Sequence, residues 1–581
     1  MKRLRIKIVG QSGMGLLSVG EMFIDAFNEL GLFVYSDREY PSLIKGGHSC
    51  FTINISDERI FSLSEFADVM IAIDSVSLSA YFDFLVEGGI LVHGMEKPLS
   101  IKRILEKAVD KNVKVIHLNA REVSKESGGS VLMQNTVLVG MAWKVLGLDI
   151  AGIEMSLRKR FAEKANVIET NLKCLNAGYD RVDSANLGSN FVKKLSDKKI
   201  EKKFLIDGNK AIALGAINCG VRAYFSYPMS PSSTVLTYLA DISEKTGMII
   251  KQAEDEITAA QMALGAMYMG TRALVATSGG GYDLMTETIS LAGIMESPIV
   301  VVIGQRPGPA TGLPTWTMQG DLNLAVFSSH GEFPRVVLAV SDSIDAFYLI
   351  QHAFNFAEKF QVPVIVLSEK TICEGKINVG TYDENAVEIE RGLVAADELV
   401  NVKREDRYAL TESGVSKRWL CGESEVYHIT NGDEHFVDGA VTEEADEVEK
   451  IYSKRMRKIE TIKKSLPKPE IFGTQKEAEI SFVGWGSSKN VMRDVIENCL
   501  EKGMKVNYLH YSFVWPIDEE SLKDFFKNNK NVHLIEENYL GQFGNLAENC
   551  GIKFDGRLLK FNGRSFFVED VMNYIDKNLQ K

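Results

Sequence analysis

The stretch Ile299-Val300-Val301-Val302-Ile303-Gly304-Gln305-Arg306 decides the fold of the middle of this chain. An unbroken run of β-branched residues that ends at a glycine predicts a strand buried on both faces, at the centre of a parallel sheet. Strands and helices are predicted to alternate around it: helix 210–219, strand 223–226, helix 233–246, strand 248–250, helix 256–269, strand 273–276 with the glycine loop 277–281, and strand 362–367. This alternation is typical of a doubly wound α/β layer with a mostly parallel sheet.

Two further α/β segments flank this layer. The chain has 581 residues, enough for about three or four domains. Strand 4–9, a glycine loop at 10–15 and a helix from 16 open the first segment, and strands near 480, 506 and 532 form the last. We predict domains at 1–190, 200–372 and 471–581, with a charged linker at 196–199 and a connector at 373–470 that ends in a charged helix.

Composition restricts the class of protein. A formal net charge of -12 argues against nucleic-acid binding, which needs a concentrated basic face. The sequence shows no signal peptide and no apolar run long enough for a membrane span, so we expect a cytoplasmic protein. The seven cysteines lie far apart, a spacing that favours free thiols over a locally encoded zinc or iron-sulfur site.

A hydroxyl between two prolines follows the strand at 223–226. In Tyr227-Pro228-Met229-Ser230-Pro231-Ser232-Ser233 the prolines restrict the backbone on both sides of Ser230, which holds its hydroxyl in a fixed orientation. The same residues also fit a rigid loop in which Ser232 or Ser233 caps the next helix.

Three acidic residues, Glu254-Asp255-Glu256, open the helix at 256–269. Acidic residues at a helix start are favoured by the free N–H groups and the helix dipole, so capping explains them. A functional role requires one of the carboxylates to be buried, where it can hold a proton and share it with a ligand.

Arg306 lies where doubly wound sheets bind ligands, beyond the carboxyl end of a central strand. A guanidinium there can grip a carboxylate through two parallel hydrogen bonds. An interdomain salt bridge is the structural alternative.

These motifs, in this order, resemble the alpha subunits of 2-oxoacid:ferredoxin oxidoreductases. The family's Tyr-Pro-Ile-Thr-Pro motif corresponds to residues 227–231, with Ser230 in place of the usual threonine. The pattern Arg-x-Gly-Pro-Ser-Thr-Gly-x-Pro-Thr continues here over residues 306–315. The loop 10–15 and residues 38–48 resemble the gamma-type domain that precedes the alpha unit in fused subunits, and residues 536–542 resemble the family's C-terminal domain. The resemblance covers nearly the whole chain and identifies the three domains as gamma-type, thiamine-pyrimidine-binding and transketolase C-terminal-like.

The resemblance assigns roles to individual residues. It implies that Glu256 activates thiamine diphosphate and that Arg306 and Ser230 position the 2-oxoacid, with Thr311 and Thr315 as further hydroxyl candidates. Tyr227 and Pro228 are expected to contact the cofactor together with Ser230. Lys45 is expected to face the substrate or coenzyme A, and a solvated loop lysine is the structural alternative.

The resemblance also implies partners. The usual diphosphate-and-magnesium motif is not visible in the sequence, so we expect a beta subunit to supply the diphosphate site, Mg²⁺ and the iron-sulfur cluster. The expected assembly is a heterodimer or a dimer of heterodimers that converts a 2-oxoacid, of the 2-oxoglutarate or pyruvate type, to acyl-coenzyme A and reduces ferredoxin.

Two alternatives stay open at this point. One is a nucleotide-dependent dehydrogenase that uses the glycine loop at 10–15, since a strand, glycine loop and helix can cradle a phosphate. The other is a non-catalytic assembly subunit that kept the fold.

Overall fold

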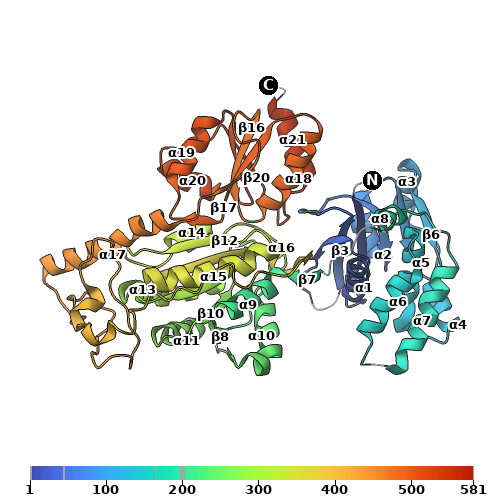
Figure 1. Cartoon of the computed structure of the whole chain (residues 1–581). Helices are drawn as coiled ribbons and strands as arrows, with labels where there is room; N and C mark the ends of the chain where they lie inside the picture. Colours follow the sequence, from blue (N-terminus) through green and yellow to red (C-terminus); the bar gives the residue numbers. More distant parts are fainter. Residues whose placement is uncertain (1–2, 44–45, 164, 196–202, 580–581) are drawn as a thin grey trace. The chain divides into compact units, whose positions relative to one another are not determined.

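A computed structural model describes residues 3–43, 46–163, 165–195 and 203–579. The chain divides into two compact units: one of Met1–Ile206, Gly375–Thr381 and Phe567–Asp570, the other of Asp207–Glu374, Tyr382–Phe566 and Val571–Lys581. Both units are α/β, as the sequence predicts, and Figure 1 follows them along the chain from blue to red. The strand pairs of the second unit are mostly parallel, whereas the sheet of the first unit combines parallel and antiparallel pairs.

The first unit is built on an eight-stranded sheet of order β6-β5-β4-β1-β3-β2-β14-β7. Its strands are β1 (Leu4–Ser12), β2 (Phe33–Glu39), β3 (Gly46–Ser56), β4 (Ala67–Ala72), β5 (Leu85–His93), β6 (Lys114–His117), β7 (Phe204–Asp207) and β14 (Lys376–Val379). The main helices are α1 (Leu16–Glu29), α2 (Ser75–Tyr81), α3 (Lys102–Asp110), α4 (Ala120–Glu126), α5 (Gln134–Leu146), α6 (Ile150–Arg160), α7 (Ala165–Asp180) and α8 (Ser189–Leu195). Phe23 and Phe27 of α1 pack on Trp143 of α5, with ring centroids 5.8 and 5.3 Å from the indole.

The last two strands in this order, β14 and β7, differ from the sequence-based expectation. β7 lies within the predicted second domain at 200–372 and β14 within the predicted connector, yet both belong to the first sheet. β14 pairs with β2, and the Asn378 side chain accepts a hydrogen bond from Val34 N at 3.0 Å and donates to Leu32 O at 2.7 Å. Such pairing across more than three hundred residues leaves no local periodic signal. The predicted linker at 196–199 lies outside the described residues.

The second unit contains a seven-stranded sheet of order β18-β12-β13-β11-β10-β8-β9. Its strands are β8 (Ala223–Ser226), β9 (Ile249–Gln252), β10 (Ala273–Thr277), β11 (Ile299–Gln305), β12 (Val336–Ala339), β13 (Pro363–Glu369) and β18 (Phe513–Trp515). The helices are α9 (Gly208–Asn218), α10 (Ser233–Thr246), α11 (Glu256–Tyr268), α12 (Gly279–Leu284), α13 (Thr286–Ile294), α14 (Leu322–Phe327), α15 (Ser343–Phe360) and α16 (Lys370–Glu374). Every residue of β11 and β13 is buried, in agreement with the predicted central strand.

This sheet extends further than the sequence predicts. β12 and β18, which lie beyond β13 in the strand order, are not among the strands that the sequence predicts for this sheet. β18 comes from the C-terminal part of the chain and pairs antiparallel with β12. In addition, the glycines expected to form a loop at 279–281 begin helix α12.

A third sheet, of order β15-β17-β16-β19-β20, occupies the C-terminal part of the second unit. Its strands are β15 (Glu470–Gly473), β16 (Ile480–Trp485), β17 (Val506–Tyr511), β19 (Val532–Glu536) and β20 (Gly556–Leu559), and its helices are α18 (Ser488–Glu501), α19 (Glu519–Asn528), α20 (Gln542–Asn549) and α21 (Val568–Leu579). Figure 1 shows α19 and α20 on one side of these strands and α18 and α21 on the other, the arrangement of a doubly wound layer.

The connector is attached to the second unit by buried ion pairs. Its helix α17 (Ala445–Ser465) places the Lys454 and Lys458 ammonium groups 2.7 and 2.5 Å from the Glu296 carboxylate. All three side chains are essentially inaccessible to solvent. Because an unpaired buried charge is costly, this contact fixes the position of the connector on the layer.

Candidate active site

Glu256, Arg306 and the Tyr227–Ser230 segment lie at one edge of the seven-stranded sheet, where the carboxyl ends of its strands meet. The Tyr227–Ser230 segment follows β8, Glu256 comes shortly after β9, and Arg306 directly follows β11. These strands run parallel through β10 and β8, so their carboxyl ends meet at the same edge. Ligands of doubly wound sheets bind at this edge.

The three acidic residues at the start of α11 have different environments. Glu254 is exposed, and Asp255 is the helix N-cap, accepting a hydrogen bond from Thr258 N at 2.7 Å. The Glu256 side chain turns inward and the residue is only 4% exposed. Its Oε1 atom is buried and has no hydrogen-bond partner among the described residues. Of these three acidic residues, Glu256 is therefore the one with a buried carboxylate oxygen that lacks a hydrogen-bond partner among the described residues.

Arg306 is anchored to the loop that follows β8. Its Nη1 donates a hydrogen bond of 2.8 Å to the main-chain oxygen of Ser230. The next residue, Pro231, follows a cis peptide bond and packs against Gly304 at the end of β11. Burial lowers the pKa of the Arg306 guanidinium, and the nearby Asp321 carboxylate opposes this shift. The contact brings Ser230 and Arg306, far apart in sequence, to one place.

The loop after β8 is held by its own hydrogen bonds. Ser232 occupies the N-cap position of helix α10, as one alternative predicts, but its Oγ donates to Met229 O at 2.9 Å and makes no capping hydrogen bond. Asn209 Nδ2 donates to Pro231 O at 2.8 Å. These bonds fix the main chain on both sides of the Ser230 hydroxyl.

The other predicted site residues differ in exposure. Tyr227 and Pro228 are exposed, Thr311 is exposed in the loop that follows Arg306, and Thr315 is buried. Lys45 lies outside the described residues.

Buried polar atoms without partners gather around the ends of β10 and β11. Within the described parts of the chain they are Glu256 Oε1, Thr277 Oγ1, Ser278 Oγ, Gln305 Nε2 and Asp321 Oδ2. Native proteins leave few such atoms unpaired, and a ligand or ordered water is the usual explanation. We call this group the polar cluster.

The glycines of α12 make room for this cluster. A Cβ atom on Gly281 would lie 2.0 Å from Thr277 Oγ1 and 2.7 Å from Glu256 Oε1. A Cβ atom on Gly279 would lie 2.6 Å from Asp321 Oδ1. The middle residue, Gly280, faces open space. Side chains at 279 and 281 would thus displace the two carboxylates.

Sequence reasoning missed Asp321. The residue stands at the N-cap position of α14, but its side chain makes no capping hydrogen bond. Burial and the negative charge of Asp283 raise the pKa of Asp321 to about 7, although Arg306 acts in the opposite direction. An acidic residue before a helix is ordinarily a cap, so the sequence contained no signal of a different role.

Gln319 was also missed, and it connects this edge to the C-terminal sheet. Its Nε2 donates to Glu369 Oε1 and to Trp485 O, both at 2.9 Å, and its Oε1 accepts from Glu537 N at 2.8 Å. Burial raises the pKa of the Glu369 carboxyl, which also accepts from Ser487. The loop between β11 and α14 is therefore fixed at both ends.

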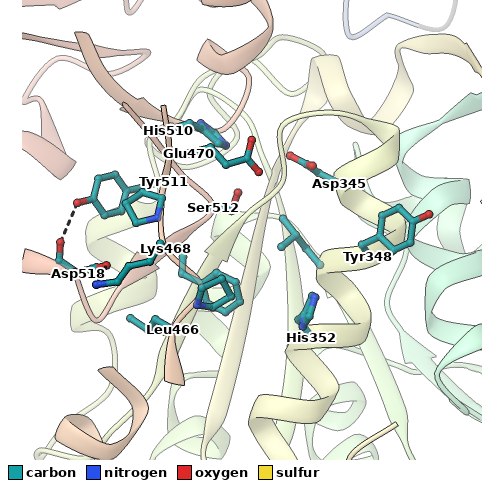
Figure 2. Close-up of a pocket in the computed structure, with 14 residues that line it drawn as sticks. Asp345, Tyr348, His352, Leu466, Lys468, Glu470, His510, Tyr511, Ser512 and Asp518 are labelled. Atoms are coloured by element: carbon teal, nitrogen blue, oxygen red, sulfur yellow. Dashed lines mark hydrogen bonds and ion pairs between the residues drawn. The ribbon is translucent and has the colours of Figure 1, made fainter. Parts of the chain in front are cut away.

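A separate cavity of about 190 Å³ lies between α15 and the C-terminal sheet (Figure 2). It is lined by Asp345, Tyr348, His352, the 466–470 segment, His510 and Tyr511, among others, and none of the predicted site residues lines it. Burial and the charge of Lys489 lower the pKa of His510 to about 3. Its Nε2 has no partner in the described structure.

The glycine loop of the first unit is not arranged for a diphosphate. The Gln11 N–H donates to Asp74 Oδ2 at 2.7 Å. A cavity of about 290 Å³ beside the loop is lined by Asp74 and Glu96. Two carboxylates oppose the binding of an anion there, so the geometry does not favour the nucleotide-dependent dehydrogenase.

Comparison with known proteins gives consistent matches over the chain. The family model described as "Pyruvate flavodoxin/ferredoxin oxidoreductase, thiamine diP-bdg" matches residues 214–419, "Pyruvate ferredoxin/flavodoxin oxidoreductase" matches 5–181, and "Pyruvate:ferredoxin oxidoreductase core domain II" matches 478–571. The chain is 32% identical to a 2-oxoacid:ferredoxin oxidoreductase subunit alpha from Sulfolobus sp, over 98% of this chain and 96% of the relative. It is 26% identical to the 2-oxoglutarate oxidoreductase subunit KorA of Mycobacterium tuberculosis, over 99% and 91%.

A solved structure is similar over the whole length. The 2-oxoglutarate:ferredoxin oxidoreductase from Magnetococcus marinus, a structure with 2-oxoglutarate, coenzyme A and succinyl-CoA bound, matches with a TM-score of 0.90 at 27% identity and covers 100% of both chains. None of the helices in the described part of the chain is both long and apolar enough to cross a membrane.

Proposed function

The chain belongs to the family of 2-oxoacid:ferredoxin oxidoreductase alpha subunits, and from this membership we propose that, together with a beta subunit, it converts a 2-oxoacid and coenzyme A to acyl-coenzyme A and CO₂. The electrons released pass singly to ferredoxin. The substrate is of the 2-oxoglutarate or pyruvate type, and the first unit takes the place of the family's gamma domain.

The observation that carries the proposal is the buried carboxylate of Glu256. A thiamine aminopyrimidine ring presents a nitrogen that can accept a proton from a carboxyl group. Glu256 Oε1 is a buried oxygen at the carboxyl ends of the strands, and none of the described residues gives it a hydrogen-bond partner. The residues present therefore fit this cofactor. When bound, thiamine diphosphate supplies the nucleophilic carbon and the electron sink for decarboxylation.

Arg306 and Ser230 provide the means to hold the substrate. Arg306 uses Nη1 for its bond to Ser230 O, while the guanidinium group has five N–H donors in all. The remaining donors can bind the 2-oxoacid carboxylate, and the Ser230 hydroxyl can donate to its keto oxygen. Thr311 and Thr315 on the following loop add hydroxyl groups, and Tyr227 and Pro228 border the cofactor. Lys45 is assigned to the substrate or coenzyme A from its motif alone.

The beta subunit is proposed to dock on the exposed face of α11. Ile257 and Met262 on this helix are 46% and 37% exposed, and Met269 at its C-cap is 56% exposed; the first residue of the helix is Glu256. Apolar side chains gathered on one helix mark an interaction surface. A partner bound there would close the site over Glu256 and bring the diphosphate and Mg²⁺ site and the iron-sulfur cluster.

The proposal is tested by co-expressing this chain with its beta subunit and measuring 2-oxoacid-dependent reduction of a redox dye in the presence of coenzyme A. Glu256→Gln keeps the shape of the side chain but cannot exchange the proton, so we expect kcat to fall by about 10²–10⁴-fold. Glu254→Gln is the matched control, because Glu254 is exposed two residues earlier. Its activity should remain within about twofold of the wild type, as for other surface changes.

Two results would contradict the proposal. One is a wild-type complex that reduces no dye with any member of a 2-oxoacid panel. The other is a Glu256→Gln complex that assembles, unfolds at the wild-type temperature and turns over at the wild-type rate.

A further inference from the structure

We propose that Asp321 is a positioning residue of the 2-oxoacid site, whose carboxyl group must be protonated for a substrate carboxylate to bind Arg306. The inference rests on the proposed function and adds that substrate binding is coupled to protonation of Asp321. It concerns a residue that none of the sequence motifs identified.

The position of Asp321 is fixed by its main chain. Its N–H donates to Gln305 Oε1 at 3.0 Å, which ties it to the end of β11, one residue before Arg306. Its main-chain oxygen accepts from Ala325 N at 2.9 Å within α14. The side chain therefore cannot move far from the ends of β10 and β11.

The carboxyl group of Asp321 points into the polar cluster. Both of its oxygens lie against Gly279, where a Cβ atom would be 2.6 and 2.7 Å from Oδ1 and Oδ2. Oδ2 is buried, and none of the described residues gives it a hydrogen-bond partner. A buried oxygen without a partner is the state expected of a group that exchanges a proton or meets a ligand.

The charged groups that act on Asp321 are Asp283 on α12 and Arg306 after β11. Burial and Asp283 favour the neutral carboxyl, and they outweigh Arg306, so that the pKa of Asp321 rises to about 7. A substrate carboxylate on Arg306 would neutralise the positive charge that favours ionisation of Asp321 and add a second negative charge nearby. Both effects raise the pKa of Asp321 further and favour proton uptake on binding.

Substrate binding is coupled to the uptake of at most one proton, which goes to the Asp321 carboxyl group. Below the pKa of Asp321 the carboxyl is already neutral, and the substrate anion binds without proton exchange. Above that pKa, binding requires that Asp321 take a proton from solvent, so affinity for the substrate falls as pH rises. No bond is made or broken in this step.

The test compares the wild-type complex with Asp321→Asn, which is permanently neutral and nearly the same size. The ratio of kcat/KM of the variant to that of the wild type, measured with 2-oxoglutarate, should be near one at about pH 6 and rise about tenfold by about pH 8. The ratio of kcat values should not change with pH, because saturating substrate removes the effect. Asp321→Glu keeps the titrating group and should retain a pH-dependent kcat/KM.

The outcomes separate this inference from the proposed function. A wild-type complex that reduces no dye with any 2-oxoacid defeats the proposed function itself. If the wild type is active and the ratio of kcat/KM between Asp321→Asn and the wild type is the same at every pH, only the role of Asp321 is overturned. This holds even if the variant is slow at every pH.

A second variant pair keeps the test valid if Asp321→Asn fails to fold. Gly279→Ala places a methyl group against both carboxyl oxygens, whereas Gly280→Ala faces open space in the same helix. Gly279→Ala should move the midpoint of the pH profile of kcat/KM by about half a pH unit or more, and Gly280→Ala should leave it in place. An identical midpoint in both variants would overturn the inference.

Discussion

The guanidinium of Arg306 is held by a main-chain oxygen rather than by the Ser230 side chain. Replacing Ser230 by alanine therefore leaves this anchor intact and tests only the hydroxyl. Replacing Arg306 by lysine removes the planar fork that binds a carboxylate with two hydrogen bonds.

For Arg306→Lys we expect kcat/KM for the 2-oxoacid to fall by about 10–100-fold, because a charge-assisted hydrogen bond contributes about 1.5–3 kcal/mol. Arg222→Lys is the matched control, since Arg222 is exposed before β8, at the opposite edge of the sheet. An Arg306→Lys complex with wild-type kcat/KM would remove this residue from the substrate site.

His510 shows a second effect at the scale of one residue. Ser488 Oγ donates to Trp485 O at 2.6 Å, so it accepts from the Tyr508 hydroxyl at 2.8 Å. The Tyr508 oxygen is then left to accept from His510 Nδ1 at 3.0 Å, which leaves Nε2 as a bare acceptor. A neutral imidazole fits this arrangement, in agreement with a pKa lowered to about 3.

This lowered pKa makes stability depend on pH. In the unfolded chain the pKa of a histidine is about 6.5, so between that pH and the folded pKa the unfolded state binds more protons. The free energy of unfolding of the wild type should therefore fall on acidification, and His510→Gln should lack this contribution. From about pH 7 to about pH 5, the wild type should lose about 2 kcal/mol more than the variant.

Urea unfolding of both proteins at the two pH values measures this difference. His330→Gln is the control, because the His330 side chain is 79% exposed. Parallel losses in the wild type and in His510→Gln would show that His510 does not remain neutral in the folded protein.

At the scale of the element, helix α12 carries three successive glycines with unequal surroundings. Gly281→Ala would force its methyl group against Thr277 and Glu256. We expect a loss of about 1–3 kcal/mol in the free energy of unfolding, as for other overpacked sites, and a lower kcat because Glu256 is displaced.

Gly280→Ala is the internal control for this prediction. It meets no atom within 4 Å, and alanine is favoured over glycine in a helix by about 1 kcal/mol. We therefore expect unchanged activity and a slightly higher melting temperature. Equal melting temperatures for the 280 and 281 variants would contradict the packing described around Glu256.

At the scale of the whole molecule, the second unit joins two sheets that the sequence predicts as separate domains. β18 pairs with β12, and Gln319 bridges Glu369 to Trp485 and Glu537. The predicted boundaries at 372 and 471 stay predictions, but these contacts couple the two layers.

We expect Gln319→Ala to destabilise both sheets together. The substitution removes the amide that hydrogen-bonds Glu369, Trp485 and Glu537. Each buried group left without a partner lowers the free energy of unfolding by about 1–3 kcal/mol. Hydrogen exchange measured by mass spectrometry should show faster exchange by a similar factor in β13 and in β16. The exposed Gln261→Ala is the control. Faster exchange confined to one sheet would mean that the layers open independently.

The sequence by itself determined most strands and helices of the middle sheet and the resemblance to the family. The apolar run at 299–303, the alternation around it and the motifs at 227–231 and 306–315 depend on neighbouring residues, and such local patterns are visible in a sequence. Local pattern also placed the helix that begins at Glu256, which the structure reproduces as α11.

Only the tertiary structure decided which groups meet. It showed that Glu256 and not Glu254 is buried, that Arg306 bonds the main chain at Ser230, and that Asp321 leaves its capping position unused. It also placed β7 and β14 in the first sheet and β18 in the second. The physical reason is that burial, hydrogen-bond partners and edge pairing depend on segments distant in sequence, whose approach is set by packing of the whole chain.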